Sequence, residues 1–264
     1  DYSTRKYRGH VWCLVTSTGY FLCRYRGRIV VTGNTGRLSS SKNPKGGGSN
    51  GQNVDREIRV IFVPDDDRIF IELDLSQAED RIVKVLAYCI APRQELLDRA
   101  RAMPWENDEH RRAAMAIFRV ANAAVTKDQR YIGKRGRHAG NYGLGGQGLA
   151  DQLIKDGYVY TPSQCADFIA AVIDRDTPEI REWQKATRIE ILKRKRLVND
   201  WERVLDFTWD RMDDDTFRRA YAFIPQSSVP SILNQYGMIP LHKAIKTNGW
   251  RAAINVNGHD SLLI

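Results

Sequence analysis

The sequence predicts an α+β fold in which a block of helices is inserted between two parts of one antiparallel sheet. Residues 69–75 form an apolar segment of strand character, and the pattern becomes helical from residue 76 to about residue 195. Near the end of the chain, residues 252–256 and 261–264 have the pattern of two strands joined around Asn257-Gly258, which is a hairpin signal. The order strand, helices, strand hairpin places the helical block within the sheet.

Several short segments precede the apolar strand. Residues 11–16 and 20–24, separated by Ser17-Thr18-Gly19, and then residues 28–32 have the composition of short strands. Residues 39–51 are polar and rich in glycine, so they cannot form a core and are expected to be a loop or linker. Residues 69–75 are apolar enough that we expect this strand to be mostly buried.

The helical block contains four stretches with helix signals. Ile82, Val85, Leu86 and Cys89 recur at helical spacing and mark one amphipathic helix, and residues 113–120 form another. A third helix begins at Pro162, because proline is favoured in the first turn. A long charged helix follows at about residues 179–195.

Composition limits the possible functions. The chain has 264 residues and a formal net charge of +9, which favours a polyanionic partner such as nucleic acid, although a merely basic soluble protein fits equally well. No apolar run approaches the roughly 18 residues of a membrane span, so a membrane partner is not expected. The cysteines lie far apart, so neither a zinc site nor a disulfide framework is indicated, and a reducing, cytoplasmic setting is expected. They are Cys13, Cys23, Cys89 and Cys165.

Two aspartates lie at the ends of predicted strands. Asp74 lies near the end of the apolar strand, and Asp260 lies at the bend of the terminal hairpin. Burying a carboxylate costs free energy unless it is paired or bound to metal. On adjacent strands the two side chains could hold a pair of divalent cations roughly 4 Å apart, an arrangement that serves phosphoryl transfer. Strand-end aspartates are also common as caps or turn residues, and that alternative remains.

A second group of side chains repeats every four residues. Arg130, Lys134, His138 and Tyr142 would therefore share one face of a helix. Such a face offers two cations to a triphosphate and two rings to a base. The alternative is a solvated basic helix face with one buried tyrosine.

Two further patterns have plain structural interpretations. Gly143, Gly145 and Gly148 match G-x-G-x-x-G, but they follow a helical pattern instead of a strand. We therefore predict a helix–turn–helix joint there and reject a dinucleotide site. The acidic triplets at residues 65–67 and 213–215 are expected to be solvated.

Taken in order, these motifs resemble those of family A DNA polymerases, the family of bacterial DNA polymerase I. Asp74-Leu-Ser-Gln-Ala-Glu79-Asp-Arg81 resembles D-Y-S-Q-I-E-L-R. The series from Arg130 to Tyr142-Gly143 resembles R-x3-K-x3-F/Y-x3-Y-G, and His259-Asp260-Ser261 resembles H-D-E. The resemblance extends over about residues 27–264. It also includes Asp108-Glu-His110, similar to D-x-H; Thr35-Gly-Arg37-Leu-Ser-Ser40 followed by Gln52-Asn53; and Arg218 with Gln226, similar to a palm helix at the primer-template minor groove.

The resemblance implies a right-hand polymerase fold with an antiparallel-sheet palm and helical fingers, and with the thumb largely absent. Residues 1–85 would be the first part of the palm with a remnant of the thumb side, 86–205 the fingers, and 206–264 the second part of the palm. By the family pattern the palm is incomplete at its end, and no exonuclease is expected in this segment. The implied protein is a divergent, phage-like DNA-directed DNA polymerase. It would act as a monomer on primer-template DNA and dNTPs, and a processivity factor stays open.

Roles follow from the matched positions. Asp74, Asp260 and the Leu75 carbonyl would bind two Mg²⁺ ions, for which Mn²⁺ can substitute. Lys134 would also protonate the leaving pyrophosphate, and Glu79 would exclude a 2′-hydroxyl. The other implied nucleotide contacts are Arg130, His110, His138 and Tyr142, and the implied DNA contacts are Arg37, Gln52, Asn53, Arg218, Gln226 and His259.

Four departures from the family pattern matter: Leu75 for Tyr, His138 for Phe or Tyr, Ser261 for an acid, and Ala222 for Asn. They bear on fidelity and sugar selectivity more than on the reaction type. Two alternatives remain. One is a single-subunit RNA polymerase of the same superfamily, which Glu79 disfavours. The other is a catalytically silent module that only binds primer-template.

Overall fold

A computed structural model describes residues 20–25, 28–33, 63–64, 67–257 and 260–264. The predicted strand at residues 11–16 and the predicted linker at residues 39–51 lie outside these ranges. None of the helices in the described ranges combines the length and apolar character needed to cross a membrane.

The segments that flank the helical block pair with each other. Strands β3 (Glu72–Asp74), β7 (Ser261–Leu263) and β6 (Val256–Asn257) form one antiparallel sheet in the order β3-β7-β6. Asp74 lies opposite Ser261 in this register. Reciprocal backbone hydrogen bonds between Ile71 and Ile264, at 3.0 and 2.9 Å, extend the ladder beyond β3. The predicted insertion of helices between two parts of one sheet is therefore confirmed.

The prediction that residues 69–75 are mostly buried is wrong. Ile69, Ile71 and Leu73 are 75%, 46% and 48% exposed, and regular strand geometry is limited to three residues. β3 is an edge strand of a small sheet, and its main partner among the described elements is β7. The apolar composition correctly indicated a strand. Within the described residues, however, no second layer of structure covers the side chains of this strand.

Two hairpins lie outside this sheet. β1 (Tyr20–Tyr25) and β2 (Arg28–Gly33) pair with Tyr20 opposite Gly33, which confirms the strands predicted at 20–24 and 28–32. β4 (Arg196–Val198) and β5 (Val204–Asp206) form a hairpin that the sequence pattern did not predict. Asn199 and Arg203, at its turn, donate hydrogen bonds to Ser227 and Ser231 at 2.9 and 3.1 Å.

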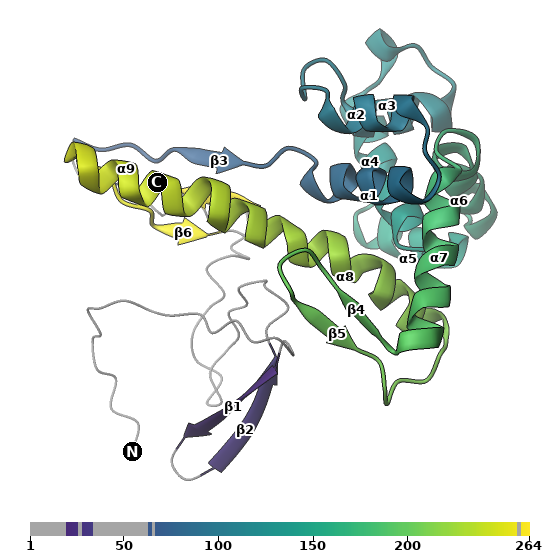
Figure 1. The fold of residues 1–264 in the computed structure, drawn as a ribbon. Coiled ribbons are helices and arrows are strands. Elements are labelled where there is room, and N and C mark those ends of the chain that lie inside the picture. Colours follow the sequence, from purple (N-terminus) through teal and green to yellow (C-terminus); the bar gives the residue numbers. More distant parts are fainter. Residues whose placement is uncertain (1–19, 26–27, 34–62, 65–66, 258–259) are drawn as a thin grey trace.

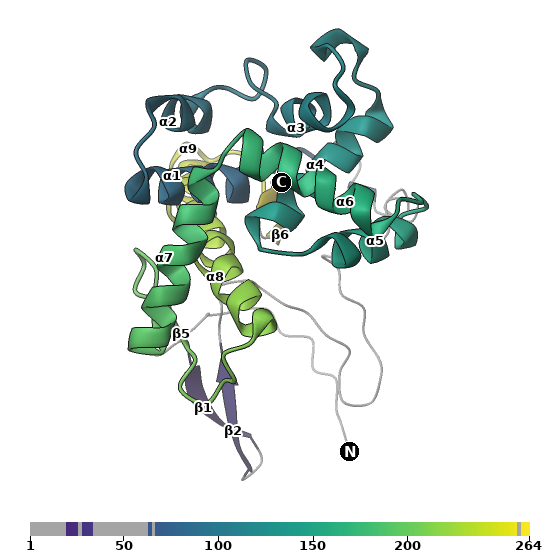
Figure 2. The ribbon, with the colours of Figure 1, turned by 90° about the vertical axis from the view of Figure 1, so that its right-hand side faces the viewer.

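Helices gather in one half of the molecule (Figures 1 and 2). Their buried faces share one apolar core, which includes Leu96, Leu149, Leu153, Ile173 and Ile180. The elements of this half are α1 (Ala78–Ile90), α2 (Gln94–Arg101), α3 (Glu109–Phe118), η3 (Asn122–Ala124), α4 (Lys127–Asn141), α5 (Gly146–Lys155), α6 (Pro162–Ile169), the π-helical η4 (Ala170–Arg175) and α7 (Glu179–Arg194).

A long run of helix connects this half to the end that holds the sheet (Figure 1). It consists of α8 (Asp214–Ile232), the π-helical η5 (Leu233–Met238) and α9 (Ile239–Asn248). Asp213 caps α8 by accepting a hydrogen bond from the Thr216 amide at 3.0 Å. The acidic triplet at 213–215 is exposed as predicted, and its first residue also begins the helix.

The predicted helices form, but one predicted buried face is wrong. α6 begins at Pro162 behind a Thr161 capping box, and α7 matches the long charged helix. In α1, however, Val85 and Cys89 are exposed, whereas Asp80 and Lys84 are buried beside Val83 and Ala87. The face is displaced because the two charged side chains belong to a buried ionic network.

The glycine-rich segment forms the predicted helix–turn–helix joint. α4 ends at Asn141 and α5 starts at Gly146. Gly143 has φ +70°, and a Cβ there would lie 2.9 Å from the Tyr221 ring. The turn therefore needs glycine both for its backbone conformation and for the close approach of α8.

Candidate active site

One pocket of about 710 Å³ opens between the sheet and the helical half. Its walls come from the end of β3, the residue before β7, α1, α3, α4 and α8. The pocket brings together ten side chains proposed from the sequence: Asp74, Leu75, Glu79, His110, Arg130, Lys134, His138, Tyr142, Arg218 and Asp260.

The carboxylates of Asp74 and Asp260 come from neighbouring strands. Because Asp74 pairs with Ser261, the preceding residue Asp260 lies beside Leu75, and the Leu75 amide donates to the Asp260 carbonyl at 2.8 Å. Burial raises the pKa of Asp74 above its ordinary value, and the negative charges of Asp260 and Glu72 raise it further, against the opposing effect of Lys134. The two carboxylates thus sense each other electrostatically.

This pair suits a divalent cation. Two carboxylates that repel each other at one strand end are relieved by positive charge, and oxygen ligands are those that Mg²⁺ prefers. Within the described residues, no three His, Cys, Asp or Glu side chains converge as a metal cluster.

The opposite wall of the pocket is one face of α4. Arg130, Lys134 and His138 lie on successive turns, and Tyr142 follows the last helical residue. A capping box of Thr126 and Gln129 fixes the start of this helix. The predicted alignment on one helix face is confirmed, and the pocket brings the cations of this face together with the carboxylates of Asp74 and Asp260.

Asp108 fixes two of these groups at once. Its Oδ1 accepts hydrogen bonds from the amides of His110 and Arg111 at 3.0 and 3.2 Å and so caps α3. Its Oδ2 accepts from Arg130 Nε at 2.6 Å. Burial raises the pKa of Asp108, but the hydrogen bonds from Arg130 and the Arg111 amide, together with the charge of Arg130, outweigh burial and lower that pKa. Arg130 is therefore held at the pocket mouth by the same residue that orients His110.

Aromatic rings continue the wall from α3 to the end of α4. The His110 and His138 ring centroids are 6.0 Å apart, and those of His138 and Tyr142 are 6.2 Å apart. Burial lowers the pKa of His110 to about 4 against the opposing effect of Asp80, and the positive charges of Lys134 and Arg130 act in the same direction as burial. Burial also lowers the pKa of His138. Both rings are therefore neutral at pH 7.

Glu79 in the first turn of α1 meets this wall, because its carboxylate accepts a hydrogen bond from the Tyr142 hydroxyl. The contact joins the motif at residues 74–81 directly to the motif that runs from Arg130 to Tyr142. It orients a carboxylate and an aromatic ring within one pocket.

A family model described as DNA polymerase family A matches residues 16–264. The chain belongs to DNA polymerase family A. It is 27% identical over 252 residues to the DNA polymerase I of Caldicellulosiruptor bescii, a match that covers 89% of this chain and 27% of that protein. It is 25% identical over 203 residues to the DNA polymerase of Bacillus phage SP01, covering 75% of this chain and 21% of that protein.

A solved family A structure shares the fold. The POL domain of Pol1 from M. smegmatis, in complex with DNA primer-template and dNTP, matches with a TM-score of 0.69 at 26% identity. The match covers 87% of this chain and 39% of that one. The predicted α+β architecture of a partial right-hand polymerase is thereby confirmed. The chain spans 27% and 21% of the length of the two curated relatives named above.

The residues that the family resemblance assigns to DNA contact are distributed differently. Arg218 and Ala222 on α8 line the pocket, whereas Gln226, further along the same helix, is half-buried outside it. The remaining candidates, Arg37, Gln52, Asn53 and His259, lie outside the described residues.

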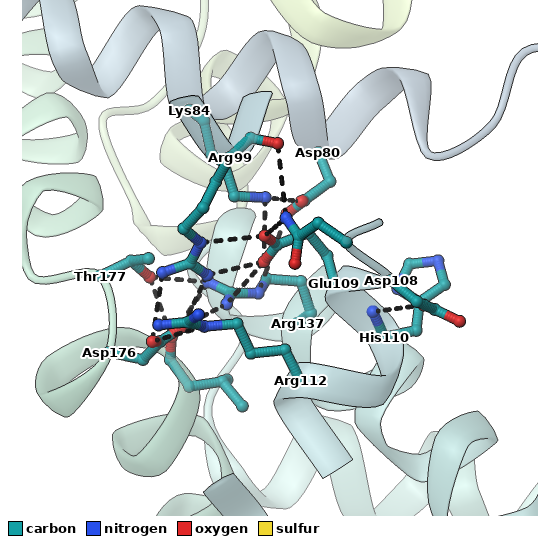
Figure 3. A network of polar contacts seen from close by, with 12 residues as sticks. Asp80, Lys84, Arg99, Asp108, Glu109, His110, Arg112, Arg137, Asp176 and Thr177 are labelled. Carbon is teal, nitrogen blue, oxygen red and sulfur yellow. Dashed lines mark hydrogen bonds and ion pairs between the residues drawn. The ribbon is translucent and has the colours of Figure 1, made fainter. Parts of the chain in front are cut away.

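Behind the pocket lies a buried ionic network that sequence reasoning missed (Figure 3). Glu109 accepts from Arg99 at 2.9 and 2.6 Å, and Asp176 accepts from Arg99 and Arg137, each at 2.8 Å. On α1, Asp80 pairs with Lys84. Asp80 stands where the family form D-Y-S-Q-I-E-L-R has leucine, and this departure, with a lysine four residues later, was the available signal.

Proposed function

We propose that this chain is the palm and fingers of a template-directed DNA polymerase. It would add dNTPs to a primer 3′-hydroxyl and release pyrophosphate. The observation that supports this proposal is the pocket in which the carboxylates of Asp74 and Asp260 face the cations of α4. The palm would comprise residues 1–85 and 206–264, and the fingers residues 86–205. The proposed setting is the cytoplasm of a bacterial or phage-infected cell, with the protein acting as a monomer.

The strand-end carboxylates would hold the metal ions. Asp74, Asp260 and the Leu75 carbonyl are the proposed ligands of two Mg²⁺ ions, with Mn²⁺ as a substitute. When bound, such ions lower the pKa of the primer hydroxyl and neutralise the charge that develops on the triphosphate. The repulsion that raises the pKa of Asp74 supports this role, since it is relieved when cations bind.

The face of α4 would receive the incoming nucleotide. Arg130 and Lys134 would bind the phosphates, and Lys134 would also give its proton to the leaving pyrophosphate. His110 would add a neutral donor. Its Nδ1 is buried and has no hydrogen-bond partner among the described residues, which is the state expected of a group reserved for a ligand.

The sugar and base would lie against Glu79, His138 and Tyr142. The hydrogen bond between Glu79 and Tyr142 supports a fixed carboxylate that excludes a 2′-hydroxyl and so selects deoxynucleotides. Beyond the pocket, the duplex would run along α8 past Arg218 and Gln226. Arg37, Gln52, Asn53 and His259 are further proposed contacts. The minor-groove acceptors are nearly alike for all base pairs, so such contacts do not require a sequence.

Alanine variants of the two aspartates test the proposal. We expect Asp74→Ala and Asp260→Ala each to reduce Mg²⁺-dependent primer extension by about 1,000-fold or more, which corresponds to several kcal/mol of transition-state stabilisation. Asp167→Ala, at an exposed position of α6, is the matched control. Primer-template binding, measured by fluorescence anisotropy, should persist in all three. Extension that survives both pocket substitutions would contradict the metal assignment.

A silent primer-template binding module is the second candidate, because the described pocket holds two strand-end carboxylates and Ser261 replaces a third acid. Wild-type protein that binds duplex tightly but never extends a primer would favour it. Extension with rNTPs as efficient as with dNTPs would instead favour the RNA polymerase alternative.

A further inference from the structure

Three of the helices that line the pocket also contribute residues to the buried network. On α3, His110 lines the pocket and the neighbouring Glu109 enters the network, and on α4 the same relation holds for His138 and Arg137. On α1, Glu79 and Asp80 both line the pocket, and Asp80 also pairs with Lys84 in the network. The network therefore adjoins the pocket and joins α1, α3 and α4 to one another (Figure 3).

Arg137 lies at the centre of this network and is fully buried. Its guanidinium contacts carboxylates from three separate elements: Asp80 at 3.8 Å, Glu109 at 3.5 Å and Asp176 at 2.8 Å. It also donates to Thr177 Oγ1 at 2.6 Å and to the Val172 carbonyl at 3.0 Å. The Nε of Arg137 donates no hydrogen bond within the described residues, so the two terminal nitrogens of the planar guanidinium fork make these hydrogen bonds.

The buried carboxylates of the network are matched by buried basic side chains. The carboxylates of Asp80, Glu109 and Asp176 face three buried cations, Lys84, Arg99 and Arg137, while Arg112 joins at the rim with 41% of its side chain exposed. Burial opposes ionisation of Glu109, yet Arg99 and Lys84 lower its pKa to about 2. The basic neighbours of Asp80 and Asp176 also lower the pKa values of these two groups against the effect of burial, so all three carboxylates are charged at pH 7.

Stability alone does not account for such a network. Buried ion pairs contribute little compared with apolar residues of the same volume, and their best-attested contribution is one specific geometry. The helical half already has an apolar core. What the network adds is a fixed orientation of α4 relative to α1 and α3.

We propose that Arg137 is a positioning residue that holds the nucleotide-binding face of α4 in register with Glu79 and His110. This inference rests on the proposed function, because the register matters for binding a nucleotide. Arg137 would make no direct contact with the substrate, because its side chain is fully buried.

Arg99 provides a matched comparison. It is 7% exposed and contacts the same two carboxylates, Glu109 and Asp176, as Arg137 does. Its helix α2, however, contributes no residue to the described pocket. A purely structural network predicts equal effects of substitution at the two arginines, whereas a positioning role predicts a difference.

The kinetic test compares Arg137→Lys with Arg99→Lys. Lysine keeps the charge and cannot reproduce the fork. We expect Arg137→Lys to lower kcat/KM for dNTP by about 10- to 100-fold, the effect of displacing a site by about 1 Å. Primer-template Kd should stay constant, and Arg99→Lys should stay within about threefold of wild type. Equal losses in both variants at matched Tm would overturn the proposal.

Thr177→Val is a milder variant in case Arg137→Lys folds poorly. It removes one hydrogen-bond partner of Arg137 and nearly keeps the side-chain volume. Thr187→Val is its control, because Thr187 is also buried but bonds only within α7, to the Trp183 carbonyl. The expected loss in kcat/KM is severalfold for Thr177→Val, with none for Thr187→Val. An equal response of the two threonine variants would count against positioning.

A spectroscopic readout separates this inference from the proposed function. The imidazole resonances of His110 and His138, assigned from their Gln variants, report the pocket wall without any turnover. They should move in Arg137→Lys and remain in place in Arg99→Lys, even if the wild-type chain extends no primer. Unchanged resonances in Arg137→Lys would exclude a positioning role, whereas absent extension with moved resonances would reject only the proposed polymerase activity.

Discussion

At the scale of single residues, the pocket depends on histidines that stay neutral. His110 is 6% exposed, and its pKa is lowered to about 4 because burial disfavours the imidazolium. Lys134 and Arg130 lie close enough to disfavour a further positive charge. A triphosphate would therefore meet two fixed cations and a neutral donor.

The same residue makes stability depend on pH. Because the folded pKa of His110, about 4, lies below its ordinary value of 6.5, the unfolded chain binds more protons between these values. The contribution of His110 to the free energy of unfolding is fully present above pH 6.5 and is lost as the pH falls towards 4. At 1.36 kcal/mol per pKa unit, the lost stability amounts to about 3 kcal/mol.

Urea unfolding of wild type and His110→Gln across pH 7 to 4 checks this expectation. The free energy of unfolding should fall more steeply for wild type, because glutamine does not titrate. His138 contributes in the same direction in both proteins, since burial also lowers its pKa. Parallel pH profiles would refute the assignment to His110.

Individual site residues were predictable from the sequence where side chains of suitable chemistry recur at a fixed spacing. Arg130, Lys134 and His138 were found because a four-residue repeat becomes one helix face. The burial of Asp80 and Arg137 was not predicted, because a charged residue in a helical pattern normally faces solvent. Their burial depends on partners such as Asp176, which lies far away in the sequence.

At the scale of elements, the pocket-lining face of α4 depends on how closely α3 and α4 approach each other. A Cβ at Gly133 would lie 2.4 Å from the His110 carbonyl oxygen and 2.7 Å from the Ala114 amide nitrogen. Both are backbone atoms, so α3 would have to move as a whole. Gly136, almost one turn later, would meet only the flexible end of Ile117 at 3.3 Å.

Alanine at these two positions should therefore act in opposite directions. Gly133→Ala is expected to lower the free energy of unfolding by about 1–3 kcal/mol, the usual cost of overpacking. Gly136→Ala should be neutral or stabilise by up to about 1 kcal/mol, because alanine favours the helix. Denaturant titration of both variants is the measurement. Equal effects would show that α3 and α4 are not packed as closely as described.

Elements with local signals were predicted well. α6 has a capping box and Pro162, and α7 has a continuous charged helical pattern, so neither needs distant partners to be recognised. The β4–β5 hairpin was missed because Asn199 and Arg203 are stabilised through serines of α8. The burial of β3 was mispredicted because composition does not reveal whether another layer covers a strand.

At the scale of the whole molecule, the two halves contribute different charged groups to the pocket. The sheet supplies Asp74 and Asp260, and the helical half supplies Arg130 and Lys134. If the helical half binds the nucleotide and the rest binds the duplex, a change on α4 should affect one step selectively.

Lys134→Ala tests that division. We expect it to slow single-nucleotide addition by about 100-fold or more, in the range of a lost general acid, with little change in primer-template affinity. Rapid-quench kinetics and anisotropy give the two quantities separately. Arg194→Ala, on α7 and paired with Glu190 outside the pocket, is the control. Equal losses of rate and duplex affinity in Lys134→Ala would indicate a plain DNA-contacting face.

The register between β3 and β7 also has a consequence for synthesis of the protein. Asp74 emerges from the ribosome early, whereas the strand that places Asp260 beside it follows the entire helical half. Pairing of segments so distant in sequence is slow and comes late in folding. A nascent chain that still lacks β7 can thus carry a folded helical half without both acidic groups in place. Translation itself would delay the arrival of Asp260 beside Asp74 until β7 is released.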